Sequence, residues 1–166
     1  EAEPDPAVDA LRRGEADVAL VYHFHTRRPP PGWSDLRYVP LAEDHVRAVL
    51  PARHRLAARS EVRMAELVDE WWVHGWGECG DAMEHAAGYE PKVACRGSDH
   101  FFIQAMVAAG IGVALVPDMA LGIVLDGVTV RPLHPTPVRH VGALLPKRGT
   151  PLAEELVRRL RDAAAS

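Results

Sequence analysis

Cysteine is scarce in this sequence: only Cys79 and Cys95 occur in 166 residues. They form no CxxC motif and are too few for a disulfide framework, so the reducing cytoplasm is the simplest compartment to expect. No apolar run approaches the roughly 18 residues that a membrane span needs, and we expect no membrane contact. The formal net charge is −4. Because binding to nucleic acid needs a basic face that displaces counterions, we expect that this chain does not itself bind DNA.

Motifs of common hydrolases and metal sites are also lacking. The sequence contains neither a GxSxG elbow nor an HExxH motif. Ser98, Asp99 and His100 are consecutive, but neighbours on a helix point about 100° apart and cannot form a catalytic relay. His23 and His25 would share one face of a strand, yet no third ligand follows at a recognisable spacing. We therefore expect solvent-exposed loop histidines, no metal, no cofactor and no enzymatic activity.

The most informative stretch is residues 92–120, KVACRGSDHFFIQAMVAAGIGVALVPDMA. Residues 92–95 alternate in polarity and favour a strand, and the apolar run 101–109 is long enough for three helical turns. Residues 113–116 form a second candidate strand, and Pro117 suits the first turn of a further helix. This β-α-β-α order predicts an α/β fold with a parallel sheet and helices on its faces.

The start of the helix expected over 101–109 is a candidate ligand site. Ser98 or Asp99 can cap it by accepting a hydrogen bond from a free N–H group, and Gly110 can end it in the left-handed conformation. In α/β folds, ligands bind beyond the carboxyl ends of the strands, where helix N-termini attract anions. Ser98, Asp99 and His100 occupy that place, although capping alone would also explain the first two.

The rest of the chain alternates strands with short helices. Strands are expected over residues 17–21, 71–74, 127–133 and 138–145. A first short helix would have Asp5 as its cap and Pro6 in its first turn. Residues 36–51 indicate two extended segments that are broken near Glu43 and Asp44.

The last helix carries the clearest signals. Thr150 is the expected cap and Pro151 the first helical residue. Three leucines spaced by four residues predict its apolar face: Leu152, Leu156 and Leu160. Two ion pairs at i,i+4 spacing are expected on the other face: Glu154 with Arg158, and Glu155 with Arg159.

Four segments resemble the effector-binding domain of LysR-type transcriptional regulators. MVAAGIGVALVP at 106–117 is similar to the most recognisable segment of that family. Three others fall in the family's order: LRRGEADVALV at 11–21, LAEDHVRAVLPARHRLAARSEV at 41–62 and GVTVRPL at 127–133. The resemblance spans nearly the whole chain.

This resemblance implies the type 2 fold of periplasmic binding proteins, with two Rossmann-like subdomains joined by two crossing strands. The outer subdomain would comprise residues 1–43 and 136–166, and the inner one residues 44–135. The family's domain begins with a further strand, helix and strand. We therefore expect the outer subdomain to lack its N-terminal βαβ start.

The function that the resemblance implies is allosteric sensing. A small metabolite would bind between the lobes of a cytoplasmic homodimer or homotetramer. DNA would be bound by an N-terminal winged helix-turn-helix that is not part of this chain. The alternative is a solute-binding protein of a transport system, which would carry a secretion signal instead.

Eight residues are predicted at the effector site. They are Asp5, Tyr22 and His23 from the outer subdomain, and His74, Trp76, Ser98, Asp99 and His100 from the inner one. The helix start together with His74 and His100 favours a carboxylate or another anion as the effector. The charge of Asp99 argues against an anion.

Overall fold

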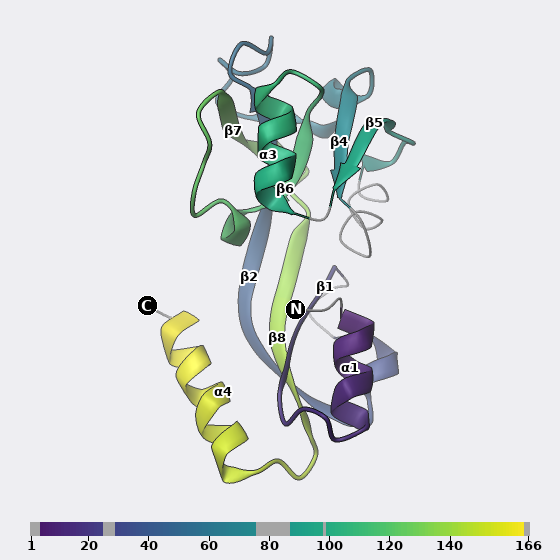
Figure 1. Ribbon diagram of the computed structural model, residues 1–166, viewed down its shortest axis with the longest axis vertical. Helices are drawn as coiled ribbons and strands as arrows, with labels where there is room; N and C mark the ends of the chain where they lie inside the picture. Colours follow the sequence, from purple (N-terminus) through teal and green to yellow (C-terminus); the bar gives the residue numbers. More distant parts are fainter. Residues whose placement is uncertain (1–3, 25–28, 76–86, 98, 165–166) are drawn as a thin grey trace. The chain divides into compact units, whose positions relative to one another are not determined.

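The computed structural model describes residues 4–24, 29–75, 87–97 and 99–164 (Figure 1). Its elements are α1 (Pro4–Arg12), β1 (Ala19–His23), η1 (Pro31–Trp33), β2 (Leu36–Pro51), β3 (Val62–Arg63), η2 (Met64–Leu67), β4 (Trp71–Gly75), β5 (Lys92–Gly97), α3 (His100–Ala108), β6 (Ala114–Pro117), η3 (Asp118–Ala120), β7 (Val128–His134), β8 (Val138–Pro146) and α4 (Pro151–Ala164). Within these ranges, no helix is both long enough and apolar enough to cross a bilayer.

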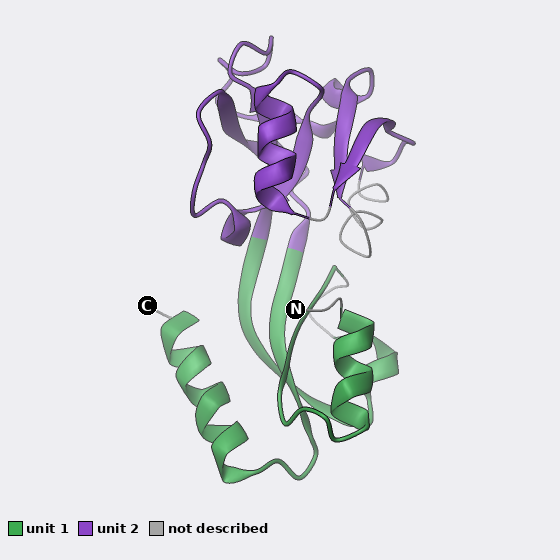
Figure 2. Cartoon of the chain, in the orientation of Figure 1, with its two compact units in different colours: residues 1–44, 139–166 green, residues 45–138 purple. Residues whose placement is uncertain are grey.

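The chain forms two compact units, which Figure 2 colours separately. Unit 1 comprises residues 1–44 and 139–166, and unit 2 comprises residues 45–138. Two strands belong to both units, because β2 passes the boundary after Asp44 and β8 passes it before Arg139.

Unit 1 is built on the strand order β1-β8-β2. β1 pairs with β8 in the antiparallel direction, with Val21 opposite Gly142. One group of buried apolar residues joins α1 to these strands: Val8, Leu11, Ala19, Val21, Trp33 and Leu144. A second group joins α4 to them: Val39, Ala143, Leu145, Ala153 and Val157. Alternation along the strands therefore provides an apolar face for each helix.

Unit 2 combines antiparallel and parallel pairing. β2 is flanked by β6 and β7, both antiparallel to it, whereas β3 pairs with β7 in parallel. β4 and β5 are parallel, and Trp72 makes a parallel bridge to Val113 just before β6. α3 buries Ile103 and Val107 in a core with Val49 and Val73. The expected parallel pairing is thus confirmed for β4 with β5. In the strand expected over 113–116 it is confirmed only at Val113, because β6 itself pairs with the crossing strand β2 in the antiparallel direction.

The expected break in residues 36–51 is wrong, since β2 runs through Glu43 and Asp44 as one strand of 16 residues. A buried carboxylate can be accommodated inside a strand when it is paired, and Asp44 is paired with Arg139. The expected helix after Pro117 is also replaced, by the single 3-10 turn η3.

The two terminal helices differ from expectation in detail. α1 begins at Pro4, so Asp5 lies exposed in its first turn and is not its cap. α4 begins at Pro151 as predicted, and the Ala153 N–H donates to Thr150 Oγ1 at 3.2 Å. Its buried face was predicted wrongly, because Ala153 and Val157 are buried while Leu152 is 79% exposed.

The ion pairs on α4 are also partly different from those predicted. Glu155 pairs with Arg159 as expected, and also with Arg158. Glu154 instead pairs with Arg37 of β2. The Glu154 carboxylate therefore ties the helix to the sheet.

Candidate functional site

The carboxyl ends of β4 and β5 in unit 2 bring an imidazole and a guanidinium together. In the parallel register His74 is opposite Arg96, and Gly75 is opposite Gly97. His74 is only 4% exposed. Arg96 Nη1 lies 2.8 Å from His74 Nδ1 and 3.5 Å from the Gly75 carbonyl oxygen. The pairing of the two strands thus fixes the guanidinium at the edge where ligands of α/β folds bind.

His74 Nδ1 has two alternative partners. Arginine carries only donors, so the Arg96 contact requires an Nδ1 without a proton and a neutral ring that carries its proton on Nε2. The Gly75 carbonyl oxygen lies 2.7 Å from the same Nδ1, which can donate to it only when Nδ1 carries a proton. Nδ1 can therefore accept from Arg96 or donate to Gly75, but it cannot do both at once.

The N-terminus of α3 follows β5 directly. Asp99 is its N-cap, and its Oδ1 accepts a hydrogen bond from the Phe102 N–H at 2.9 Å. Gly97 allows this tight connection, because a Cβ there would lie 2.3 Å from a ring carbon of Phe102. His100 is the first helical residue and is half-buried. The capping role predicted for Asp99 is confirmed.

The charges at this place oppose one another. The Arg96 guanidinium and the positive end of the α3 dipole attract anions, while the Asp99 carboxylate repels them. The Asp99 side chain already satisfies one N–H of the first turn. An anion here would therefore depend on Arg96 more than on the helix end.

Two of the predicted residues of unit 1, Tyr22 and His23, lie at the end of β1. The Tyr22 ring centroid is 4.9 Å from the Arg139 guanidinium carbon, a cation–π distance. His23 is 5% exposed and stacks on His140, with a centroid distance of 5.3 Å, while Trp33 contacts it edge-on. The expectation of a solvent-exposed loop position is wrong for His23, because pairing with β8 draws it into a group of aromatic rings.

Three predicted positions, His25, Trp76 and Ser98, lie outside the described residues. Asp5 is described and exposed on α1. Around α3, the structure brings together the strand ends that carry His74 and Arg96, because α3 packs against both β4 and β5. Arg96 was missed by the sequence analysis, although a charged residue at the end of a strand and three positions before a helix cap was a usable signal.

Comparison with known proteins identifies the family. Residues 1–165 match the model described as LysR substrate binding domain. The chain belongs to this family. The transcriptional dual regulator GltC of Bacillus subtilis (strain 168) is 29% identical over 147 residues, which are 84% of this chain and 47% of GltC. This LysR substrate-binding domain therefore spans about half the length of that relative.

Solved structures of the family share the fold. The CcmR regulatory domain of Synechocystis PCC6803, solved in complex with 2-PG, has a TM-score of 0.78 at 16% identity, covering 98% of this chain and 80% of that one. The C-terminal domain of a probable LysR family regulator from Rhodococcus sp. RHA1 has a TM-score of 0.76 at 27% identity, covering 96% and 81%. The predicted mixed α/β fold of LysR regulatory domains is confirmed.

Family membership also settles the class of function. LysR substrate-binding domains are effector-binding regulatory domains, and the family is not enzymatic. The predictions of a regulatory domain and of no enzymatic activity are confirmed.

Proposed function

We propose that this domain is the metabolite sensor of a LysR-type transcriptional regulator and that it binds a carboxylate or another small anion at the carboxyl ends of β4 and β5. The observation that carries this proposal is the contact between Arg96 and His74 beside the start of α3. A guanidinium held at the end of a parallel strand pair faces the edge that most α/β folds use for ligands.

Arginine suits an anionic effector for geometric reasons. Its planar fork can form two parallel hydrogen bonds to one carboxylate, which fixes the orientation of the ligand as well as its charge. The α3 N-terminus adds a partial positive charge on the same side of the strands. His74, buried and in contact with Arg96, holds the guanidinium in place.

Several features of the whole regulator belong to the same proposal. The two compact units would be the two Rossmann-like subdomains of the family, with boundaries near residues 44 and 136. DNA would be bound by a winged helix-turn-helix N-terminal to this domain, in a cytoplasmic homodimer or homotetramer. A ligand can bias such an assembly only by binding its two states with different affinity. The roles of Asp5, Tyr22 and His23 in effector binding stay predictions.

A thermal-shift screen tests the class of effector. The panel would contain small carboxylic acids, aromatic acids and amino acids, each beside its uncharged primary amide. A ligand that binds the native state raises Tm in proportion to the logarithm of its excess over Kd. We expect at least one acid to raise Tm while its amide does not. An amide that stabilises the domain as well as its acid would contradict an anion site.

A further inference from the structure

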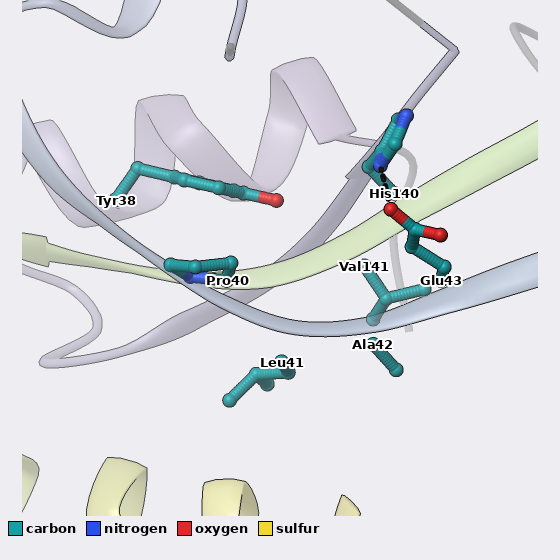
Figure 3. Close-up of a pocket in the computed structure, with 7 residues that line it drawn as sticks. All are labelled: Tyr38, Pro40, Leu41, Ala42, Glu43, His140 and Val141. Carbon is teal, nitrogen blue, oxygen red and sulfur yellow. Dashed lines mark ion pairs between the residues drawn. The ribbon is translucent and has the colours of Figure 1, made fainter. Parts of the chain in front are cut away.

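A pocket of about 500 Å³ lies within unit 1, beside the neighbouring strands β2 and β8 (Figure 3). Residues of both strands line it, among them Tyr38, Pro40, Leu41, Glu43, His140 and Val141. Its volume falls within the range of small-molecule sites. It shares no residue with the strand ends that carry His74 and Arg96. We propose that this pocket is a second ligand site, which takes a small organic cation consisting of a protonated amine on an apolar body.

The charge of the pocket favours a cation. None of the described residues that line it is lysine or arginine, and Glu43 supplies a carboxylate whose side chain is 53% exposed. Glu43 Oε1 lies 3.9 Å from His140 Nδ1, which is beyond the length of a hydrogen bond. Arg139, which precedes His140 on β8, is bound to Asp44. An incoming ammonium group would therefore meet an accessible carboxylate whose ion-pair contact among these lining residues is His140, at 3.9 Å.

Tyr38 contributes an aromatic ring to the lining of the same pocket. In Figure 3 its hydroxyl is directed toward the side of the pocket where His140 and Glu43 lie. Gly142 allows the ring to lie against β8, because a Cβ there would be 2.3 Å from a ring carbon of Tyr38. Burial raises the pKa of the Tyr38 phenol, so its hydroxyl stays neutral. A neutral phenol in the lining offers a cation both its π-system and its oxygen.

The remaining lining suits the apolar part of such a ligand. Leu41 and Val141 are half-buried, and Pro40 is exposed. These residues add aliphatic surface to the lining of the pocket (Figure 3). A ligand that combines a ring or branched chain with one amine would match both kinds of surface, whereas a fully polar cation would leave the aliphatic surface uncovered.

The test compares three probes of one shape. 2-Phenylethylamine, 2-phenylethanol and 3-phenylpropionate share an aromatic body and differ in charge. Each would be titrated into the intact chain and followed by NMR chemical shifts. The test variant is Glu43→Gln, which removes the charge at an exposed position. The matched control is Glu61→Gln, which makes the same change at an exposed residue of unit 2.

We expect saturable binding of the amine, with shifts centred on Tyr38, His140 and Val141, and an affinity about tenfold above that of the alcohol. Glu43→Gln should weaken the amine about fivefold to tenfold, and Glu61→Gln should not. Equal binding of amine and alcohol, an unchanged affinity in Glu43→Gln, shifts centred on Arg96, or no saturation would each overturn the proposal. Arg96→Gln should leave amine binding intact, so failure of the anion site and failure of this pocket are distinguishable.

Discussion

Arg139 of β8 holds the carboxylate of Asp44 of β2 in a buried ion pair, although the two residues are 95 positions apart in the chain. Arg139 Nη2 lies 2.6 Å and Nε 3.1 Å from Asp44 Oδ2, and the Asp44 side chain is completely buried. The pair sits where β2 and β8 both pass from one compact unit to the other. The same guanidinium lies over the ring of Tyr22. One arginine thus ties together β1, β2 and β8 at the unit boundary.

Removing one partner of this ion pair should be costly. Asp44→Asn would leave the Arg139 guanidinium largely buried beside a neutral amide. We expect a loss of about 3 kcal/mol in the free energy of unfolding, measured by urea denaturation. The comparison variant is Asp118→Asn, which breaks the more exposed pair with Arg47 and should cost about 1 kcal/mol or less. Equal losses in the two variants would contradict the role assigned to burial.

Asp99 should have separable effects on stability and on binding. Asp99→Asn keeps an oxygen that can accept from the Phe102 N–H, so stability should hardly change, while the affinity for an anion should rise because a repelling charge is lost. Asp99→Ala removes the cap as well and should cost about 1 kcal/mol of stability. Thermal melts and ligand titrations on both variants check this. A weaker affinity in Asp99→Asn would show that the carboxylate itself contacts the effector.

The buried face of α4 gives a third prediction. Val157→Ala should destabilise the domain by about 2 kcal/mol, because Val157 is buried against β2 and β8. Leu152→Ala, at a position that is 79% exposed, should change stability by less than about 0.5 kcal/mol. Urea denaturation of the two variants gives both values. A larger loss in Leu152→Ala than in Val157→Ala would instead support the predicted face, on which the leucines pack against the sheet.

Local patterns predicted most of the elements, and long-range pairing decided where the predictions were wrong. α3 and its cap, the strands on either side of it and the start of α4 depend on residues within a few positions of each other, so periodicity and capping rules located them. The continuity of β2 depends on Arg139, far away in the sequence. The buried face of α4 depends on which side chains of β2 and β8 lie beneath it, and the spacing of Leu152 and Leu156 contains no information on that.

Only the residues of the candidate site that local patterns mark could be predicted, because the others depend on long-range pairing. His74 and Asp99 stood out because each follows or ends a clear apolar segment. Arg96 became significant only through its register with His74, which requires the pairing of β4 with β5. His23 appeared to be a loop residue because its strand was placed two positions too early, and its partner His140 is distant in sequence. The pocket beside Glu43 likewise requires β2 and β8 to be neighbours.

Tyr89 should make stability depend on alkaline pH. Burial raises the pKa of its phenol from 10.0 to about 12, and the hydroxyl donates to the Met64 carbonyl oxygen at 3.0 Å. Folding raises the pKa of this phenol, so the folded state favours its neutral form. The stabilisation that this provides is complete below pH 10 and is lost as the pH rises from there through about 12. Tyr89→Phe should therefore lose less stability over this range in urea titrations. Identical slopes for the two proteins would contradict this assignment.

The most direct test of the anion site is the Kd of the best acid from the screen, measured by calorimetry for wild type, Arg96→Gln and Arg59→Gln. Both variants remove one positive charge, but Arg59 is an exposed residue of unit 2, outside the β4 and β5 strand ends. A charge-assisted pair of hydrogen bonds predicts that Arg96→Gln weakens binding at least about tenfold, whereas Arg59→Gln leaves Kd unchanged. Equal Kd values for wild type and Arg96→Gln would contradict the account and place the effector elsewhere.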